Sequence, residues 1–367
     1  MPVAPTLSSL PNETASRNEN CAEVRAVDPL GSSSEWDSLA LSQSAHTIFH
    51  SAAWARVLHR TYGHRPFYYV LSKGSAVSAL LPMMEVRSAI TGRRGVCLPF
   101  SDSCAPLGFD AHEFKLVEEN VRNTALEQRW KYYELRGGDE LMAPEAFPAT
   151  TFYSHSLSLT SSEEDLWRRC SSAVRRGIRR ATKNGLKTEV GVDRNSVLEF
   201  FKLHGKTRRR HGLPPQPLAF FISIYEEVIN RGHGFVVLAR KGTRVIAGAV
   251  FFKFGRNALY KFGASDAAFQ EFRGNNLTMW EGMKTLAASQ CQRLDFGRTS
   301  PDNEGLRHFK MGWGATEGKL NYFVYDMVKR GWKKRDREGS AFHHRIFGSM
   351  PLSFNRVAGA LAYRHLD

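Results

Sequence analysis

Polar residues that could carry chemistry gather in one stretch of the chain, from Leu259 to Phe323. Hydrophobic and β-branched patterning predicts short strands there, separated by loops and helices. The polar residues at the ends of these strands and in the following loops are Lys261, Ser265, Asp266, Asp295, Arg298, Asn303 and Lys310. A purely structural unit places its charges on solvated helix faces, so charges that flank apolar strands indicate a binding or catalytic site.

The sequence lacks the motifs of several enzyme classes. It contains no GxSxG, HExxH, GxxxxGK[ST] or GxGxxG pattern. These absences disfavour serine-nucleophile, zinc-hydrolase, P-loop and dinucleotide-dependent chemistry. We therefore expect neither a metal nor a permanently bound cofactor.

The net charge of +15 is concentrated in two regions of the chain. Residues 161–215 hold fourteen Lys and Arg against six Asp and Glu, and residues 329–367 hold nine against three. This concentration favours a polyanionic partner such as RNA, a nucleotide diphosphate or an anionic membrane surface, whereas DNA is not expected. Solvated helix faces that aid solubility would produce the same composition.

Cysteine spacing and the chain start indicate a cytoplasmic protein. The five cysteines are scattered, which is typical of reduced thiols rather than of a disulfide framework. Residues 1–20 have neither the basic start nor the apolar core of a secretory signal and are predicted to be a disordered tail. No apolar run approaches the ~20 residues of a membrane-spanning helix, so any membrane contact is expected to be peripheral, at the inner face.

Two successive segments, 21–160 and 161–328, have similar orders of predicted elements. Each has helical periodicity, then a three-stranded meander, then a helix and two further strands. The predicted helices are 49–63, 112–130, 163–184, 193–210, 216–230 and 274–290, and the stretch 76–86 is predicted as one strand. This weak repeat predicts an α/β (α+β) fold of two tandem domains, each with a mixed, mainly antiparallel sheet and packed helices. Residues 329–367 are predicted as a basic helical tail.

Six phrases carry a family resemblance. They are TYGHRPFY (61–68), LPFSDSCAPL (98–107), RRGIRRATKNGL (175–186), TRRRHGLPPQP (207–217), YKFGASD (260–266) and DFGRTSPDNEGLRHFKMGWGA (295–315). In content and order they resemble the GNAT-fold acyltransferases related to the Fem peptidyltransferases, including exopolysaccharide-associated members. The resemblance implies two GNAT-like domains. Only the second has the Phe-Lys and Asp-Phe-Gly-Arg phrases, so the first is expected to be an acceptor platform.

The resemblance also implies roles for single residues. Lys310 matches the lysine of the family's Phe-Lys pair. It would stabilise the oxyanion formed when an amine attacks an ester or thioester. A lysine on the outer face of a short helix would give the same sequence pattern. Asp102 would orient or deprotonate that amine, or merely cap a turn. Asp295 either pairs with Arg298 or leaves Arg298 to clamp a phosphate. The expected substrate-binding residues are Lys261, Asp266, Arg298, Asn303, Phe309, Arg208 and Arg209.

Arg273, Gly274 and Asn275 precede the predicted helix 274–290. Free N–H groups at a helix start attract anions, and the order strand, Arg-Gly loop, helix resembles the pyrophosphate loop of GNAT enzymes. An ordinary N-cap has the same sequence appearance. These three residues are therefore candidates for binding the acyl donor.

The chain is thus predicted to be an N-acyltransferase acting on an amine of a cell-envelope or polysaccharide precursor, either small or lipid-linked. Acyl-CoA and aminoacyl-tRNA both remain as co-substrates, and an aminoacyl-tRNA-dependent Fem-type peptidyltransferase of peptidoglycan is the alternative. The long coiled-coil arm typical of tRNA-using Fem enzymes is missing. A non-catalytic protein that binds RNA or an anionic membrane is the alternative of another class. The basic tail would either lie on an anionic leaflet, which would suit a lipid-linked acceptor, or pack on the second domain as a closing helix.

Overall fold

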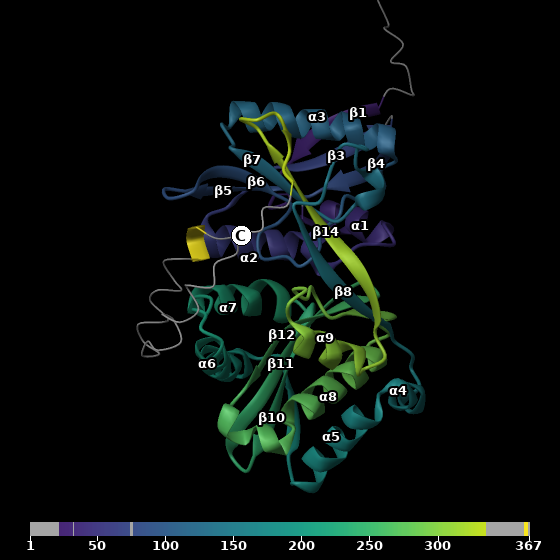
Figure 1. Ribbon diagram of the computed structural model, residues 1–367, viewed down its shortest axis with the longest axis vertical. Coiled ribbons are helices and arrows are strands. Elements are labelled where there is room, and N and C mark those ends of the chain that lie inside the picture. The colour runs from purple at the N-terminus through teal and green to yellow at the C-terminus, as the bar shows by residue number, and fades with distance from the viewer. Residues whose placement is uncertain (1–21, 32, 74–75, 335–362, 366–367) are drawn as a thin grey trace, which may run out of the picture.

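The computed structural model describes residues 22–31, 33–73, 76–334 and 363–365. Within these ranges the strands form a three-stranded sheet, ordered β1-β3-β4, and a twelve-stranded sheet that runs through the length of the molecule (Figure 1). The path of the large sheet is β2-β5-β6-β7-β14-β8-β13-β12-β11-β10-β9, with β15 paired to β14. The architecture is mixed α/β, as the sequence predicted.

The N-terminal half contains β1–β7 and α1–α3. Its strands are β1 (Ala22–Val27), β2 (Arg65–Pro66), β3 (Tyr68–Lys73), β4 (Ala76–Leu81), β5 (Met84–Ser88), β6 (Gly92–Val96) and β7 (Tyr132–Arg136), and its helices are α1 (Ser33–Ser42), α2 (Ala52–Tyr62) and α3 (Ala111–Glu127). The start of α2 is fixed by Ser51, whose hydroxyl accepts from the Trp54 N–H, and its end by Gly63 in the left-handed region. Asp110 and Glu113 form a capping box on α3.

The C-terminal half contains α4–α9 and β9–β13. Its helices are α4 (Glu163–Arg169), α5 (Ser172–Lys183), α6 (Arg194–Arg210), α7 (Leu218–Ile224), α8 (Gly274–Ala288) and α9 (Glu304–Met311), and its strands are β9 (Lys187–Gly191), β10 (Gly234–Lys241), β11 (Arg244–Phe254), β12 (Asn257–Ser265) and β13 (Arg293–Asp295). Alternate residues of β10 and β11 enter two different cores. The core on one face includes α6 and α7, and the core on the other includes α5 and α8.

Two long strands join the halves: β8 (Thr150–Ser158) and β14 (Thr316–Asp326) (Figure 1). β8 pairs with β14 and β13, and β14 also pairs with β7 of the N-terminal half. The apolar core is continuous across the junction, because Trp54 of α2 contacts the rings of Phe220 and Phe252. The two halves are therefore packed together through one shared sheet and one shared core.

Several predicted elements are divided differently in the structure. The stretch 76–86 is two strands rather than one, since Pro82 interrupts the backbone pairing, and β4 and β5 lie in different sheets. The predicted helix 163–184 is broken into α4 and α5, because Ser171 caps a new helix by accepting from the Val174 N–H. The predicted helix 216–230 consists of α7 followed by a π-helical turn, Tyr225–Ile229.

Other predictions meet the limits of the described residues. β1 and α1 were not expected from the sequence. The predicted tail 1–20 lies outside the described residues, as does most of the predicted helical tail 329–367. Its described parts include the short strand β15 (Gly331–Trp332) and a turn at Tyr363–His365, which contacts Ser88 of the N-terminal half and Arg208 and Pro214 of the C-terminal half.

Candidate active site

The site lies where two parallel strands part. β12 and β13 pair over only three residues each, from Asn257 with Arg293 to Leu259 with Asp295. Beyond Asp295 the chain keeps following β8, since the Phe296 N–H donates to the His155 carbonyl and Thr299 bridges to Tyr153. β12 stays with β11, so the two strands diverge. Lys261 and Asp295 lie at this divergence.

Lys261 lies at an irregularity of its own strand. In the β11–β12 ladder Phe251 pairs with Tyr260 and Val250 pairs with Phe262, which leaves Lys261 as the extra residue of a β-bulge. A bulge turns a side chain away from the alternation of the pleat. Here the Lys261 ammonium points into the divergence and donates to the Phe100 carbonyl, 2.8 Å away.

A loop of the N-terminal half enters the divergence and carries Asp102. Leu98 and Phe100 have φ of 55° and 58°, a conformation that costs a bulky residue free energy and marks functional loops. Arg136 of β7 stabilises the loop by donating to the carbonyls of Leu98 and Ser101. The loop is therefore held in a strained shape by a buried guanidinium.

Asp102 forms an ion pair with Lys261, with 2.9 Å between Oδ2 and Nζ. Both side chains are mostly withdrawn from water, at 8% exposure for Lys261 and 21% for Asp102. Burial alone would raise the pKa of Asp102, but Lys261, Arg298 and Lys310 outweigh it and keep that pKa below its usual value. Burial lowers the pKa of Lys261 despite its partner. Asp102 is therefore ionised, and it joins the two halves electrostatically.

Asp295 has the opposite character. Burial and the nearby Asp102 charge raise its pKa to about 6, against the opposing effects of the Gly297 N–H and Lys310. The Gly297 N–H donates to Oδ1 at 2.6 Å. Gly297 has φ of +70°, and a Cβ there would come 3.1 Å from the Asp102 carboxyl carbon, so glycine allows the two carboxylates to approach. Two carboxylates with different pKa values side by side are a typical acid–base arrangement.

Lys310 supports the turn that follows Asp295. Its side chain is only 2% exposed, and Nζ donates to the carbonyls of Gly297 and Arg298 at 2.7 and 3.2 Å. Burial lowers its pKa to about 8, although Asp102 and Asp295 act in the opposite direction. The lysine is therefore inside the cluster and not on an outer helix face.

Arg298 does not pair with Asp295 in the structure. Its guanidinium donates to the Tyr322 hydroxyl at 2.9 Å and stacks on the rings of Phe152 and Tyr322. Tyr322 in turn donates to the Asp102 carbonyl at 2.5 Å. Of the two alternatives for the Asp-Phe-Gly-Arg phrase, the structure does not contain the Asp295–Arg298 pair, because the turn at Gly297 directs the two side chains to different neighbours. Phosphate binding by Arg298 stays a prediction.

The Lys261–Asp102 pair leads to a stability prediction. Asp102→Ala leaves the Lys261 ammonium buried without its partner, which should lower the free energy of unfolding by about 3 kcal/mol. Lys261→Met should cost a similar amount, and the double variant should cost at least ~1 kcal/mol less than the sum of the two. Urea unfolding of the three variants measures this coupling. Strictly additive losses would show that the pair contributes nothing.

The start of α8 forms a second part of the site. Arg273 is in the left-handed region, at φ 59°, and no side chain caps the helix. The first-turn N–H groups, at Gly274 and Asn275, therefore have no side-chain acceptor. A Cβ on Gly274 would lie 2.7 Å from the Ala247 Cβ, so glycine lets α8 start directly against β11. An uncapped helix start is a suitable anion site, in contrast to the ordinary N-cap.

Two adjoining cavities open at this helix start. One, of about 270 Å³, is lined by residues that include Gln270, Arg273 and Asn275. The other, of about 680 Å³, lies between α5 and α9, and its lining includes Arg176, Arg180 and His308. Arg273, Asn276 and Phe309 line both. The cavities form a basic groove that leads away from α8.

The remaining predicted residues lie elsewhere or have structural partners. Asp266 caps the short turn Ala267–Phe272 and pairs with Lys206 and Arg244, and Asn303 caps α9. Arg208 donates to the Pro214 carbonyl and to the Tyr363 hydroxyl. Arg209 is exposed and lines a separate surface pocket with Lys206 and Arg244. These four residues are not brought to the carboxylate cluster, whereas Phe309 lines the basic groove.

Sequence reasoning missed three residues that shape the site. All three lie on strands. Arg136 and Tyr322 donate to carbonyls of the Asp102 loop, and the charge of Arg293 lowers the pKa of Asp295. Their only sequence signal is polarity within an apolar strand. Among the described residues, no three His, Cys, Asp or Glu side chains come together as metal ligands would. No described helix has the length and apolar character needed to cross a bilayer.

Residues 168–320 match the family model described as Acetyltransferase (GNAT) domain. These residues are a GNAT-type acetyltransferase domain. The GNAT domain contains Lys261, Arg273, Asp295 and Lys310, whereas Asp102 comes from outside it. This domain confirms the prediction that the chain is an acyltransferase. No curated protein sequence matches the chain.

Solved structures extend the likeness to most of the chain. FemX aligns with a TM-score of 0.65 at 14% identity, over 82% of this chain and 96% of FemX. A tandem GNAT protein from the clavulanic acid biosynthesis pathway aligns at 0.54 and 10%, over 83% and 98%. L-PGS from Bacillus licheniformis aligns at 0.52 and 14%, over 89% and 99%. At these identities the likeness shows the fold, which is the tandem GNAT fold that the sequence predicted.

Proposed function

We propose that the chain is an acyl-CoA-dependent N-acyltransferase whose acceptor is an amine of a cell-envelope or polysaccharide precursor. One observation carries the proposal. The same GNAT domain contains both the uncapped start of α8, with its basic groove, and Asp295, a carboxylate whose pKa is about 6. The first feature fits a diphosphate, and the second fits a base that works near neutral pH. The envelope assignment rests on the Fem resemblance of the sequence.

The residues at α8 fit the diphosphate of an acyl-CoA. N–H groups of Gly274 and Asn275 would bind phosphate oxygens, and Arg273 would add a charged donor. The groove lined by Arg176 and Arg180 continues from there and would hold the further phosphate of the nucleotide. An aminoacyl-tRNA donor would use the same basic surface, so the choice of donor has to be tested directly.

The reaction assigned to the cluster is direct transfer. The acceptor ammonium first releases one proton to solvent; the neutral amine nitrogen then attacks the thioester carbonyl, a C–N bond forms and the C–S bond breaks. Asp295 accepts the proton that the nitrogen loses and returns it to the departing thiolate. Lys310 holds the 297–298 turn and keeps a positive charge beside the developing negative charge. Asp102, held by Lys261, faces the same space and orients the amine.

Donor binding provides the test of this assignment. Arg273→Gln should weaken the binding of CoA by about tenfold, because one charge-assisted contact to a phosphate is lost. Isothermal titration of the full chain with CoA and with acetyl-CoA measures this. Lys187→Gln, on the exposed side of β9, removes the same charge away from the groove and should leave the affinity unchanged. If the wild type binds neither CoA compound but binds an aminoacyl-tRNA, the Fem-type alternative replaces the acyl-CoA proposal.

A further inference from the structure

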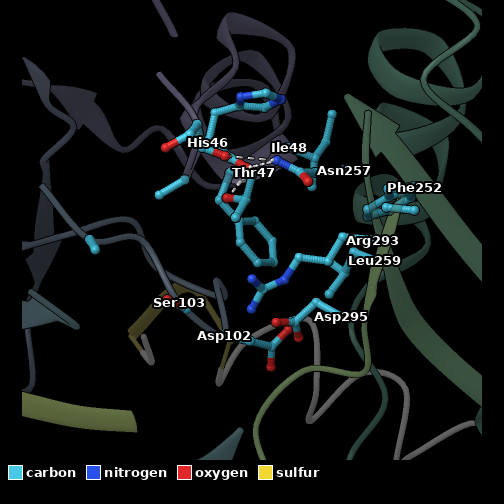
Figure 2. Close-up of a pocket in the computed structure, with 15 residues that line it drawn as sticks. His46, Thr47, Ile48, Asp102, Ser103, Phe252, Asn257, Leu259, Arg293 and Asp295 are labelled. Atoms are coloured by element: carbon cyan, nitrogen blue, oxygen red, sulfur yellow. Dashed lines mark hydrogen bonds between the residues drawn. The ribbon is translucent and has the colours of Figure 1, made fainter. Parts of the chain in front are cut away.

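A separate pocket reaches the two carboxylates from the junction of the halves. Figure 2 shows it between the segment 44–49, the Asp102 loop and the first residues of β12 and β13. Its volume is about 230 Å³, roughly the space of one amino-acid-sized molecule. It shares no lining residue with the two cavities at the start of α8. Asp102 and Asp295 line this pocket and neither of the other two.

The walls of this pocket combine apolar surface with charges at one end. Phe49, Phe252 and Leu259 supply the apolar surface. Asp102 and Asp295 lie side by side at one end (Figure 2), and both are only half-buried, whereas Lys310 is buried. Asp102 already pairs with Lys261, so Asp295 is the carboxylate that attracts a protonated amine. The walls beside them would accept a few methylene groups.

Arg293 gives the pocket a cation as well. It is the first residue of β13, opposite Asn257 of β12, and its side chain is exposed. In Figure 2 its guanidinium points into the pocket toward Asp102 and Asp295. No salt bridge joins Arg293 to a described carboxylate, although its charge acts on Asp295. An acceptor that carries only an amine has no anionic group to pair with the Arg293 guanidinium. An acceptor with an anionic group a few bonds from its amine would satisfy both ends.

We infer that this pocket is the acceptor site and that the acceptor presents a primary amine on a short aliphatic arm together with a carboxylate. The amine lies between Asp102 and Asp295, and the carboxylate pairs with Arg293. The inference rests on the proposed acyl transfer and adds the chemical class of the acceptor. The group is either a free diamino acid or the carboxyl-terminal residue of a larger precursor.

Matched probes test the inference. Lysine and cadaverine carry the same amine arm and differ only in the carboxylate. The full chain, saturated with CoA, is titrated calorimetrically with each of them and with the dipeptide Ala-Lys, which keeps both the free carboxylate and the side-chain amine. We expect lysine or Ala-Lys to bind at least tenfold more tightly than cadaverine. Whichever of the first two binds better identifies a free amino acid or a peptide end as the source.

Variants locate the discrimination. Arg293→Gln should bind lysine, Ala-Lys and cadaverine with about equal affinity. Arg256 is an exposed neighbour on the β11–β12 turn, and Arg256→Gln should keep the wild-type preference for the carboxylate-bearing probes over cadaverine. CoA titration of each variant checks that it is folded. Equal binding of lysine, Ala-Lys and cadaverine to the wild type, or a preference that survives Arg293→Gln, overturns the inference. If CoA itself fails to bind, the proposed function fails instead, so the two failures are distinguishable.

Discussion

Replacing Asp295 with asparagine is expected to lower kcat/KM for acyl transfer by a factor of about 10²–10⁴, the usual contribution of a positioned general base. Asparagine keeps the oxygen that accepts from the Gly297 N–H, so the local turn should be retained. The loss is therefore expected in turnover with little change in CoA affinity. Asp302→Asn, on the exposed loop before α9, is the matched control and should behave as wild type.

The same carboxylate sets the acid side of the pH profile. A base must be deprotonated to act, so kcat/KM should rise with pH through about 6, the pKa of Asp295. Lys310 contributes only as an ammonium, so activity should fall again as pH passes about 8. The rise near pH 6 should be absent from the residual activity of Asp295→Asn. An unchanged acid limb in that variant would assign the base to another group.

Stability should change in the opposite direction from activity. The folded-state pKa of Asp295 is raised, so the folded protein holds a proton that the unfolded chain releases, and stability falls as pH rises from about 4 to about 6. Above pH 6 the ionised carboxylate costs on the order of 3 kcal/mol, since the pKa rises from 3.8 to about 6 and one pKa unit corresponds to about 1.4 kcal/mol. Asp295→Asn should remove this cost. Urea unfolding at pH 8 should show a more stable variant, with the advantage shrinking toward pH 4.

Lys310→Ala is expected to reduce kcat by about 10² or more, because a fixed charge beside the reacting carbonyl and the support of the Asp295 turn are lost together. Two buried carbonyls lose their donor, which should also lower the free energy of unfolding by about 1–3 kcal/mol. The acceptor KM should change much less than kcat. Lys319→Ala, exposed on β14, controls for loss of a lysine.

Steady-state kinetics with saturating acetyl-CoA separate the two effects of Lys310. Turnover that is unchanged in a folded Lys310→Ala variant would remove this residue from the reaction centre. A loss of stability alone, with normal kcat at low temperature, would reduce its role to holding the carbonyls of Gly297 and Arg298.

The fold was predictable where local signals agreed with packing. The helix over 274–290 and the meander before it follow from periodicity and turn residues, and α8 and β10–β12 confirm them. Division of the stretch 76–86 at Pro82 was not predictable from alternation, because both parts are apolar and only the assignment to two sheets separates them. Pairing of β14 with β7 is also a long-range contact, to which no local pattern in either strand points.

The site was predictable by residue type but not by partner. Asp102, Asp295, Lys261 and Lys310 were candidates from the sequence, and the structure brings them together. The ion pair between Lys261 and Asp102 depends on a β-bulge and on a strained loop 159 residues away in sequence, neither of which has a sequence signature here. Pairing of Arg298 with Asp295 was one of two open alternatives, and in the structure Arg298 donates to Tyr322 instead. Side-chain direction, not residue type, was the missing information.

Mass spectrometry of amine acceptors incubated with acetyl-CoA and the full chain tests the central claim most directly. The account predicts that an amine gains one acetyl group with wild type, that CoA thiol is released in equal amount, and that Asp295→Asn slows both by about 10² or more. Equal rates for wild type and Asp295→Asn, or acyl transfer only from an aminoacyl-tRNA, would contradict it.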